Sequence, residues 1–133
     1  MVGMIAAILE SGDPQRLYTA LSLLVSAASE GEPARGLVSF GALEPLLDDR
    51  LQARGLRPEA APHVGAGGRD AFARTLGELR DTALELDDCR LWACAAAVEA
   101  TGVSVATIEE RFDGVMSTPR FLRETAGARL VVV

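Results

Sequence analysis

The sequence contains no lysine, so all thirteen of its basic residues are arginine. Without a side-chain amine the chain has no residue for Schiff-base chemistry, and it lacks the P-loop lysine that holds a nucleotide's terminal phosphates. Long hydrophobic runs are missing too. The apolar amino terminus has no basic region and stops after about nine residues, and no later stretch approaches a membrane span. These absences predict a cytoplasmic protein without a membrane segment.

Cysteine and histidine are scarce, with two cysteines, Cys89 and Cys94, and one histidine, His63. In the cytoplasm both cysteines are expected to be free thiols. A lone histidine in a proline-flanked loop is expected to be solvated. Adjacent acidic residues point to different faces and no histidine accompanies them, so no metal site is predicted; the pairs are Asp48-Asp49, Asp87-Asp88 and Glu109-Glu110.

The chain has 133 residues, of which 49% are hydrophobic and 24% charged. This length and balance predict one globular domain that covers residues 1–133. The formal net charge is -6 and the sequence pI is near 4.8. A negative surface repels phosphate backbones, so nucleic acid is not an expected partner.

Apolar runs alternate with segments of helical spacing along most of the chain. Residues 3–9, 35–40, 90–93 and 129–133 read as buried strands, and helices are expected between them. Residues 50–68 contain two prolines and a glycine cluster, and are expected to form a long exposed connection. Alternating strands and helices predict an α/β fold, a three-layer α/β/α sandwich around a mainly parallel sheet of about five strands.

Two glycine-containing turns precede helices, where a phosphate could bind. The cluster at residues 65–68 does not follow a strand, as a dinucleotide fingerprint requires, and is expected to be a flexible loop. Asp13 in the first turn would repel a flavin phosphate. No cofactor is therefore predicted.

Ligands of an open parallel sheet bind where the carboxyl ends of the strands meet. Cys94 stands at such a point, between a strand and a helix start, where the helix dipole and free amides favour the thiolate. It is the predicted catalytic residue. The residues predicted to bind substrate lie at the same edge and are Ser11, Gly12, Asp13, Phe40, Gly41 and Ala95.

The alternative reading of Cys94 is a small buried apolar side chain, which is common for a free cysteine. Cys89 would precede it by a full strand length of about 16 Å, and a disulfide needs Cα atoms within about 7 Å. Cys89 is therefore expected to be a bystander at the amino end of the strand.

The sequence resembles the DsrE/DsrF-like family of small sulfur-relay proteins. The resemblance rests on the opening apolar strand with SGDPQRLYTALSLLVSAASEG, on SFGALEPLL and on CRLWACAAAVEATGV, and covers most of the chain apart from residues of about 50 to 67. It implies a three-layer α/β/α fold, assembly into homo-oligomers or with related subunits, and a persulfide on Cys94. The implied partners are a sulfur donor protein and an acceptor thiol.

Two other functions stay open. Leu23 and Ala27 lie off the main apolar stripe of the first helix, which would suit a non-catalytic subunit that binds partners through its helices. A thiol peroxidase is less favoured, because no cluster of arginine, threonine and proline precedes Cys94.

Overall fold

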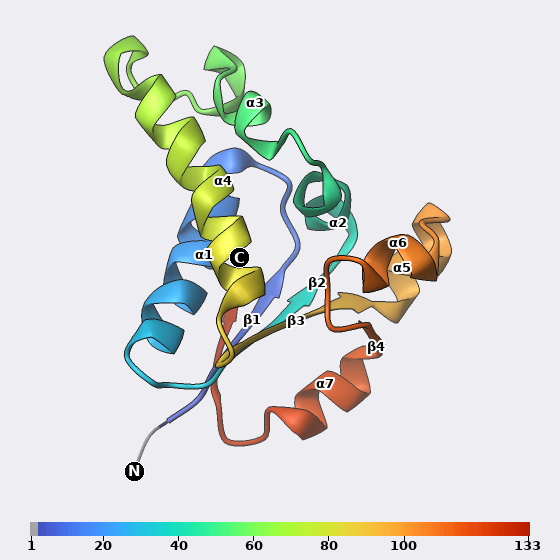
Figure 1. Cartoon of the computed structure of the whole chain (residues 1–133). Coiled ribbons are helices and arrows are strands. Elements are labelled where there is room, and N and C mark those ends of the chain that lie inside the picture. Colours follow the sequence, from blue (N-terminus) through green and yellow to red (C-terminus); the bar gives the residue numbers. More distant parts are fainter. Residues whose placement is uncertain (1–2) are drawn as a thin grey trace.

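The structure is a computed structural model that describes residues 3–133, apart from the side chain of Ala60. Five parallel strands form one sheet in the order β4-β3-β2-β1-β5. Helices cover both faces of the sheet, which confirms the predicted three-layer sandwich (Figure 1). The elements are β1 (Ile5–Leu9), α1 (Pro14–Ser29), β2 (Ala34–Val38), α2 (Phe40–Leu47), α3 (Leu51–Gly55), η1 (Pro58–Ala60), η2 (Ala66–Gly68), α4 (Arg69–Glu85), β3 (Cys89–Cys94), α5 (Ala95–Thr101), α6 (Val105–Glu109), β4 (Val115–Met116), α7 (Thr118–Glu124) and β5 (Arg129–Val132).

The central strands are buried because helices pack on both of their faces. β1 pairs with β2 on one side and with β5 on the other, and four of its five residues are buried. Gly36 in β2 leaves room for an apolar contact, since a Cβ there would lie 2.4 Å from a methyl carbon of Leu91. A larger residue at this position would push β2 and β3 away from α1.

Helix α1 begins where the sequence predicts. Asp13 caps it by accepting a hydrogen bond of 3.1 Å from the amide of Arg16, and Pro14 occupies the first helical position, where no donor is needed. Its apolar stripe is buried against the sheet and consists mainly of Leu17, Ala20, Leu21 and Leu24. Helix α4 lies beside α1 on the same face of the sheet (Figure 1).

Residues 50–68 are mostly exposed, as the sequence predicts, but they are not an irregular connection. They contain α3 and two short 3₁₀ turns, and both Leu51 and Ala61 are fully buried. Pro58 begins a 3₁₀ turn instead of preventing one, and Gly65 precedes the other. The segment packs α3 against α4 and is part of the folded domain.

Helix α7 covers the opposite face of the sheet, with Phe121 fully buried and its ring edge-on to Trp92 at 6.4 Å between centroids. The two-residue strand β4 comes before it and pairs with Ala93 and Cys94. This strand was missed in the sequence, because two residues carry no readable periodicity. Among residues 3–133, no helix is long and apolar enough to cross a membrane.

Candidate active site at the carboxyl edge

Cys94 is the last residue of β3 and the N-cap of α5, as the sequence predicts. Its backbone is still extended, with φ at -65° and ψ at 125°. The residue is 4% exposed. Cys94 therefore lies directly beneath the carboxyl edge of the sheet, where the chain passes from strand to helix.

The strands on both sides of β3 bring hydroxyl groups to the sulfur. Val38 pairs with Ala93, so Ser39, the next residue after β2, comes beside Cys94. On the other side β4 leads into α7, and the Oγ1 of Thr118 lies 3.9 Å from the Sγ of Cys94. The two hydroxyls thus reach the sulfur from two separate elements.

The pKa of Cys94 is lowered from the ordinary thiol value by a balance of opposing effects. Burial is the largest single effect and would raise the pKa. The amides of Ala97 and Ala96 and the hydroxyls of Ser39 and Thr118 act against burial and outweigh it. Of these four groups, the Thr118 hydroxyl lies within hydrogen-bond distance of the sulfur, at 3.9 Å, and neither amide makes a regular cap hydrogen bond to it. The surroundings of the sulfur therefore stabilise the thiolate more than water does for an ordinary cysteine.

The sulfur has polar donors around it, but a reagent has limited access. Cys94 itself is buried, whereas Ala96 and Thr118, which contribute hydrogen bonds to it, are exposed residues. The sulfur thus lies just below a surface of exposed residues.

The predicted substrate-binding residues fall into two groups around this edge. Ala95 follows Cys94 and begins α5. Gly12 and Gly41 lie against one another, because a Cβ on Gly12 would come 2.4 Å from the Gly41 carbonyl oxygen. They join the turn after β1 to the turn after β2. In the sheet β2 is the neighbour of β3, and β1 is the next strand beyond it.

Phe40 lies between Ser39 and Gly41 and has a backbone φ of 26°, a region that non-glycine residues rarely adopt. Its side chain is 49% exposed, so internal packing does not account for its conformation. A Cβ on Gly41 would lie 2.7 Å from the Glu10 carbonyl oxygen. The turns after β1 and β2 are therefore in close contact beside Phe40.

Ser11 and Asp13 belong to the start of α1. The Ser11 hydroxyl accepts a hydrogen bond of 3.1 Å from the Asp13 amide. Asp13 also lines a cavity of about 420 Å³ with His63 and others, namely Gln15, Arg16, Thr19, Pro62 and Val133. The amide of His63 donates to the Gln15 side chain at 3.1 Å. His63 therefore lies on the β1–β5 side of the edge, two strands away from β3.

Cys89 occupies the opposite end of β3, where the sequence predicts it. Burial raises its pKa to about 11; nearby Arg35 opposes this shift and Asp113 adds to it. Both cysteines are free. Cys89 is thus a protonated, buried thiol at neutral pH.

Ser39 and Thr118 were not identified from the sequence. Ser39 lies inside the strand predicted over residues 35–40, whereas in the structure β2 ends at Val38 and Ser39 precedes α2. Ending the strand at Val38 would have placed it at the carboxyl edge. Thr118 depends on β4, for which the sequence gives no signal.

Within the described part of the chain, no three histidine, cysteine or acidic side chains gather closely enough to hold a metal ion. Comparison with known protein families and with curated proteins finds no match to this chain.

Proposed function

We propose that this protein is a small cytoplasmic sulfur carrier or sulfurtransferase that forms a persulfide on Cys94, as its resemblance to the DsrE/DsrF-like family implies. The observation that supports this most directly is the set of donors around the sulfur. Two amides and two hydroxyls, from Ala96, Ala97, Ser39 and Thr118, lower the pKa of Cys94 against the opposing effect of burial. These groups stabilise a sulfur anion without adding a charge.

The proposed reaction is an exchange between sulfur atoms. The Cys94 thiolate attacks the terminal sulfur of a donor persulfide, a new S–S bond forms to Cys94, and the donor's S–S bond breaks. The donor leaves as a thiolate and takes a proton from solvent. An acceptor thiolate then attacks the terminal sulfur on Cys94 and releases the Cys94 thiolate. Electrons balance without an external oxidant, because the transferred sulfur keeps its oxidation state.

The donors suit both stages of this exchange. The thiolate is the attacking form before transfer and the leaving group after it, and a lowered pKa favours its departure. Serine and threonine hydroxyls rotate freely, so they can follow the negative charge from the cysteine sulfur to the added one. None of the groups contributing hydrogen bonds to this sulfur is an imidazole or a carboxylate. The site therefore fits transfer of an anionic sulfur better than hydrolysis, which needs a base.

The test is to incubate the protein with inorganic polysulfide, remove the excess, and weigh the intact chain. We expect one added sulfur atom in the wild type and in Cys89→Ala, and none in Cys94→Ser. Addition of a small thiol should then return the original mass. An unchanged mass in the wild type, or equal addition in Cys94→Ser, would rule out the persulfide proposal.

A partner-binding subunit is the second candidate, and an incompletely covered sheet face favours it. Leu130 and Val132 in the edge strand β5 are 50% and 62% exposed, and Leu122 on the neighbouring helix α7 is 49% exposed. The sequence also suggests a partner surface on α1 at Leu23 and Ala27. In the structure Leu23 is 37% exposed but Ala27 is buried, so α1 offers less exposed apolar surface. We propose that β5 and α7 bind a second copy or a related subunit.

Light scattering after size-exclusion chromatography tests this second candidate. The wild type should be larger than a monomer, and Leu130→Asp should reduce it to one. Leu23→Asp serves as the matched control on α1 and should leave the mass unchanged. A monomeric wild type would count against this interface.

A further inference from the structure

The segments that meet at Cys94 carry no charged side chain. They are residues 36–43, 91–98 and 114–119, and none of them contains aspartate, glutamate, arginine or histidine, although charged residues make up 24% of the chain. The strand order β4-β3-β2 brings the three segments together at the carboxyl edge. Burial affects the pKa of Cys94 most, and the four groups that oppose it are all neutral. The immediate surroundings of the sulfur are therefore uncharged.

The charged residues that follow these segments do not supply a free cation to the edge. Glu44 pairs with Arg54 at 2.7 Å, and Arg120 pairs with Glu124 at 3.7 Å. Glu99, which follows the second segment, is an exposed acid on α5. An anionic substrate thus finds no positive charge in the three segments that surround the sulfur.

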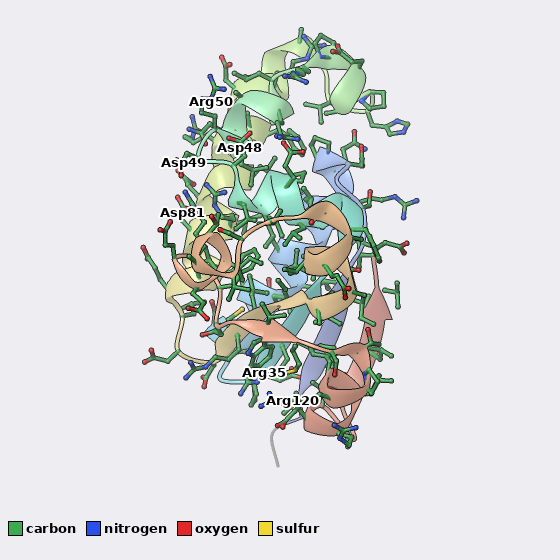
Figure 2. All side chains as sticks on the ribbon, turned by 90° about the vertical axis from the view of Figure 1, so that its right-hand side faces the viewer. Arg35, Asp48, Asp49, Arg50, Asp81 and Arg120 are labelled. Atoms are coloured by element: carbon green, nitrogen blue, oxygen red, sulfur yellow. The ribbon has the colours of Figure 1, made fainter. Side chains whose placement is uncertain are left out.

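Figure 2 shows how the labelled charges are distributed on this side of the molecule. Asp48, Asp49 and Asp81 lie toward one end, while Arg35 and Arg120 lie toward the other. The end of β3 and the short strand β4 lie between these two groups. The edge that carries the sulfur is therefore separated from the labelled acidic group and from the labelled basic one.

Both elements that bring a hydroxyl to the sulfur also expose a large apolar side chain. Phe40 follows Ser39 directly, and Leu122 stands four residues after Thr118 on α7; each is 49% exposed. Side chains four residues apart share a helix face and lean toward the amino terminus, so Leu122 leans toward Thr118. Seven large apolar side chains are exposed among residues 3–133. Two of them therefore adjoin the hydroxyls of one thiol site.

Phe40 occupies a backbone conformation that suits glycine better. Its φ is 26°, which glycine adopts without the strain that a Cβ brings. Half of its surface is exposed, so packing in the core does not explain why a large ring stands there. Strained residues are concentrated in ligand-binding and catalytic sites. An exposed ring on a strained backbone beside Ser39 favours a role in binding.

We propose that Cys94 exchanges sulfur with an uncharged, apolar donor, and that Phe40 and Leu122 select this donor by contacting the apolar group next to its reacting sulfur. This inference rests on the proposed sulfur exchange and names its substrate class. A small anionic donor such as thiosulfate fits less well, because the neutral segments offer no cation to hold its charge. Selection therefore depends on apolar contact.

The test uses thiol reagents that differ only in the group beside the reacting atoms. The Cys94 thiolate adds to the double bond of N-benzylmaleimide or N-methylmaleimide, and solvent supplies the proton. Rates are measured in Cys89→Ala so that one thiol reacts, and the benzyl-to-methyl rate ratio is divided by that of free cysteine. We expect a corrected ratio of about ten, from partial burial of the benzyl ring. Phe40→Gly and Leu122→Ser should each lower it about threefold.

Matched variants separate apolar contact from a structural effect. Phe40→Gly removes the ring and relieves the strain together, so a lower ratio does not reflect a more strained turn. Phe40→Trp keeps an aromatic ring and should keep the preference. Leu56→Ser removes a similarly exposed apolar side chain at the end of α3 and should leave the ratio at its starting value.

A corrected ratio near one, or an equal loss in Leu56→Ser and Phe40→Gly, would overturn the proposal. So would a corrected preference for iodoacetate over iodoacetamide, which have the same shape but differ in charge. No step of this test requires a persulfide. An unchanged mass after polysulfide treatment would therefore overturn the proposed function while the ratio stays measurable, and a lost ratio with a normal mass gain would overturn the selectivity alone.

Discussion

Cys89 and Cys94 lie at the two ends of β3 and are each 4% exposed, yet their pKa values move in opposite directions. At Cys89 burial is the main effect, and it raises the pKa to about 11. At Cys94 four hydrogen-bond donors overcome burial and the pKa is lowered. The two residues have equal exposed fractions, but the Cys89 thiol lies deeper in the protein than that of Cys94. The two thiols therefore differ both in depth and in the polar groups around them, and both differences follow from the end of the strand that each occupies.

The difference follows from the direction of the sheet. At the carboxyl edge strands pass into helices, so free amides and the hydroxyls of capping residues gather there. Ser39 follows β2 and Thr118 begins α7 after β4, so two turns contribute to the environment of one thiol. At the amino end Cys89 is close to Arg35 and Asp113, whose opposing charges leave burial dominant.

The largest effect is expected from loosening the element that presents Ser39. Arg80 is 3% exposed and donates hydrogen bonds to the carbonyl oxygens of Leu46 and Asp48, at 3.0 and 2.8 Å, where α2 ends. Arg80→Met leaves both carbonyls without this donor and should lower the free energy of unfolding by about 3 kcal/mol. Urea unfolding measures this loss.

Arg80→Met should also affect the two cysteines differently. Because α2 begins beside Ser39, Arg80→Met should also raise the pKa of Cys94 while that of Cys89 stays unchanged. Arg74→Met, an exposed arginine on the same helix, is the control and should alter neither stability nor pKa. Equal pKa changes at both cysteines would show that α2 does not set the difference.

The next effect concerns Cys89 and alkaline stability. Its pKa is about 11 in the folded protein and near 9 in an ordinary thiol, so the unfolded chain loses this proton first as the pH rises. The free energy of unfolding should therefore fall by about 2–3 kcal/mol between about pH 9 and pH 11 because of this group. Urea unfolding of the wild type and Cys89→Ala across this range measures the contribution.

Cys94 should contribute with the opposite sign. Its pKa is lower in the folded state, so its ionisation adds stability that is complete above the ordinary thiol pKa and lost as the pH falls through the folded value. The alkaline loss should disappear in Cys89→Ala and persist in Cys94→Ala. A loss of the same size in both variants would assign it to other groups.

The smallest effect tests the strained turn beside Ser39. Phe40 has the one positive φ among the non-glycine residues between 3 and 133, and it lies at the Cys94 end of the sheet. Phe40→Gly should be about 1 kcal/mol more stable than Phe40→Ala, because both lack the ring but only alanine keeps the strained Cβ. Thermal unfolding of the two variants provides the comparison. The usual order, with alanine more stable, would show that this turn is relaxed.

Much of this architecture was predictable from the sequence because it rests on contiguous apolar runs. The strands β1 and β3, the helix α1 with its cap at Asp13, and the place of Cys94 between strand and helix all follow from local patterns. The structure of residues 50–68 did not follow from local patterns. Proline and glycine usually mark irregular segments, whereas here Pro58 and Gly65 adjoin short 3₁₀ turns. Leu51 and Ala61 are buried through contacts with distant elements.

The surroundings of Cys94 were less predictable than its position. The amides of Ala96 and Ala97 are local to the start of α5, so a helix start at this point implies them. The hydroxyls come from residues 39 and 118, and only the strand order brings them together. A sequence read without β4 cannot place Thr118 beside Cys94, because the register of that two-residue strand sets the approach.

The most direct test is the rate of alkylation of Cys94 across pH, measured in Cys89→Ala so that one thiol reacts. We predict a midpoint below 9, the ordinary value for a thiol, and a shift to higher pH when Ser39→Ala and Thr118→Ala are combined with it. A midpoint at or above 9, or one that the removal of both hydroxyls leaves unchanged, would contradict the claim that this edge of the sheet lowers the pKa of Cys94.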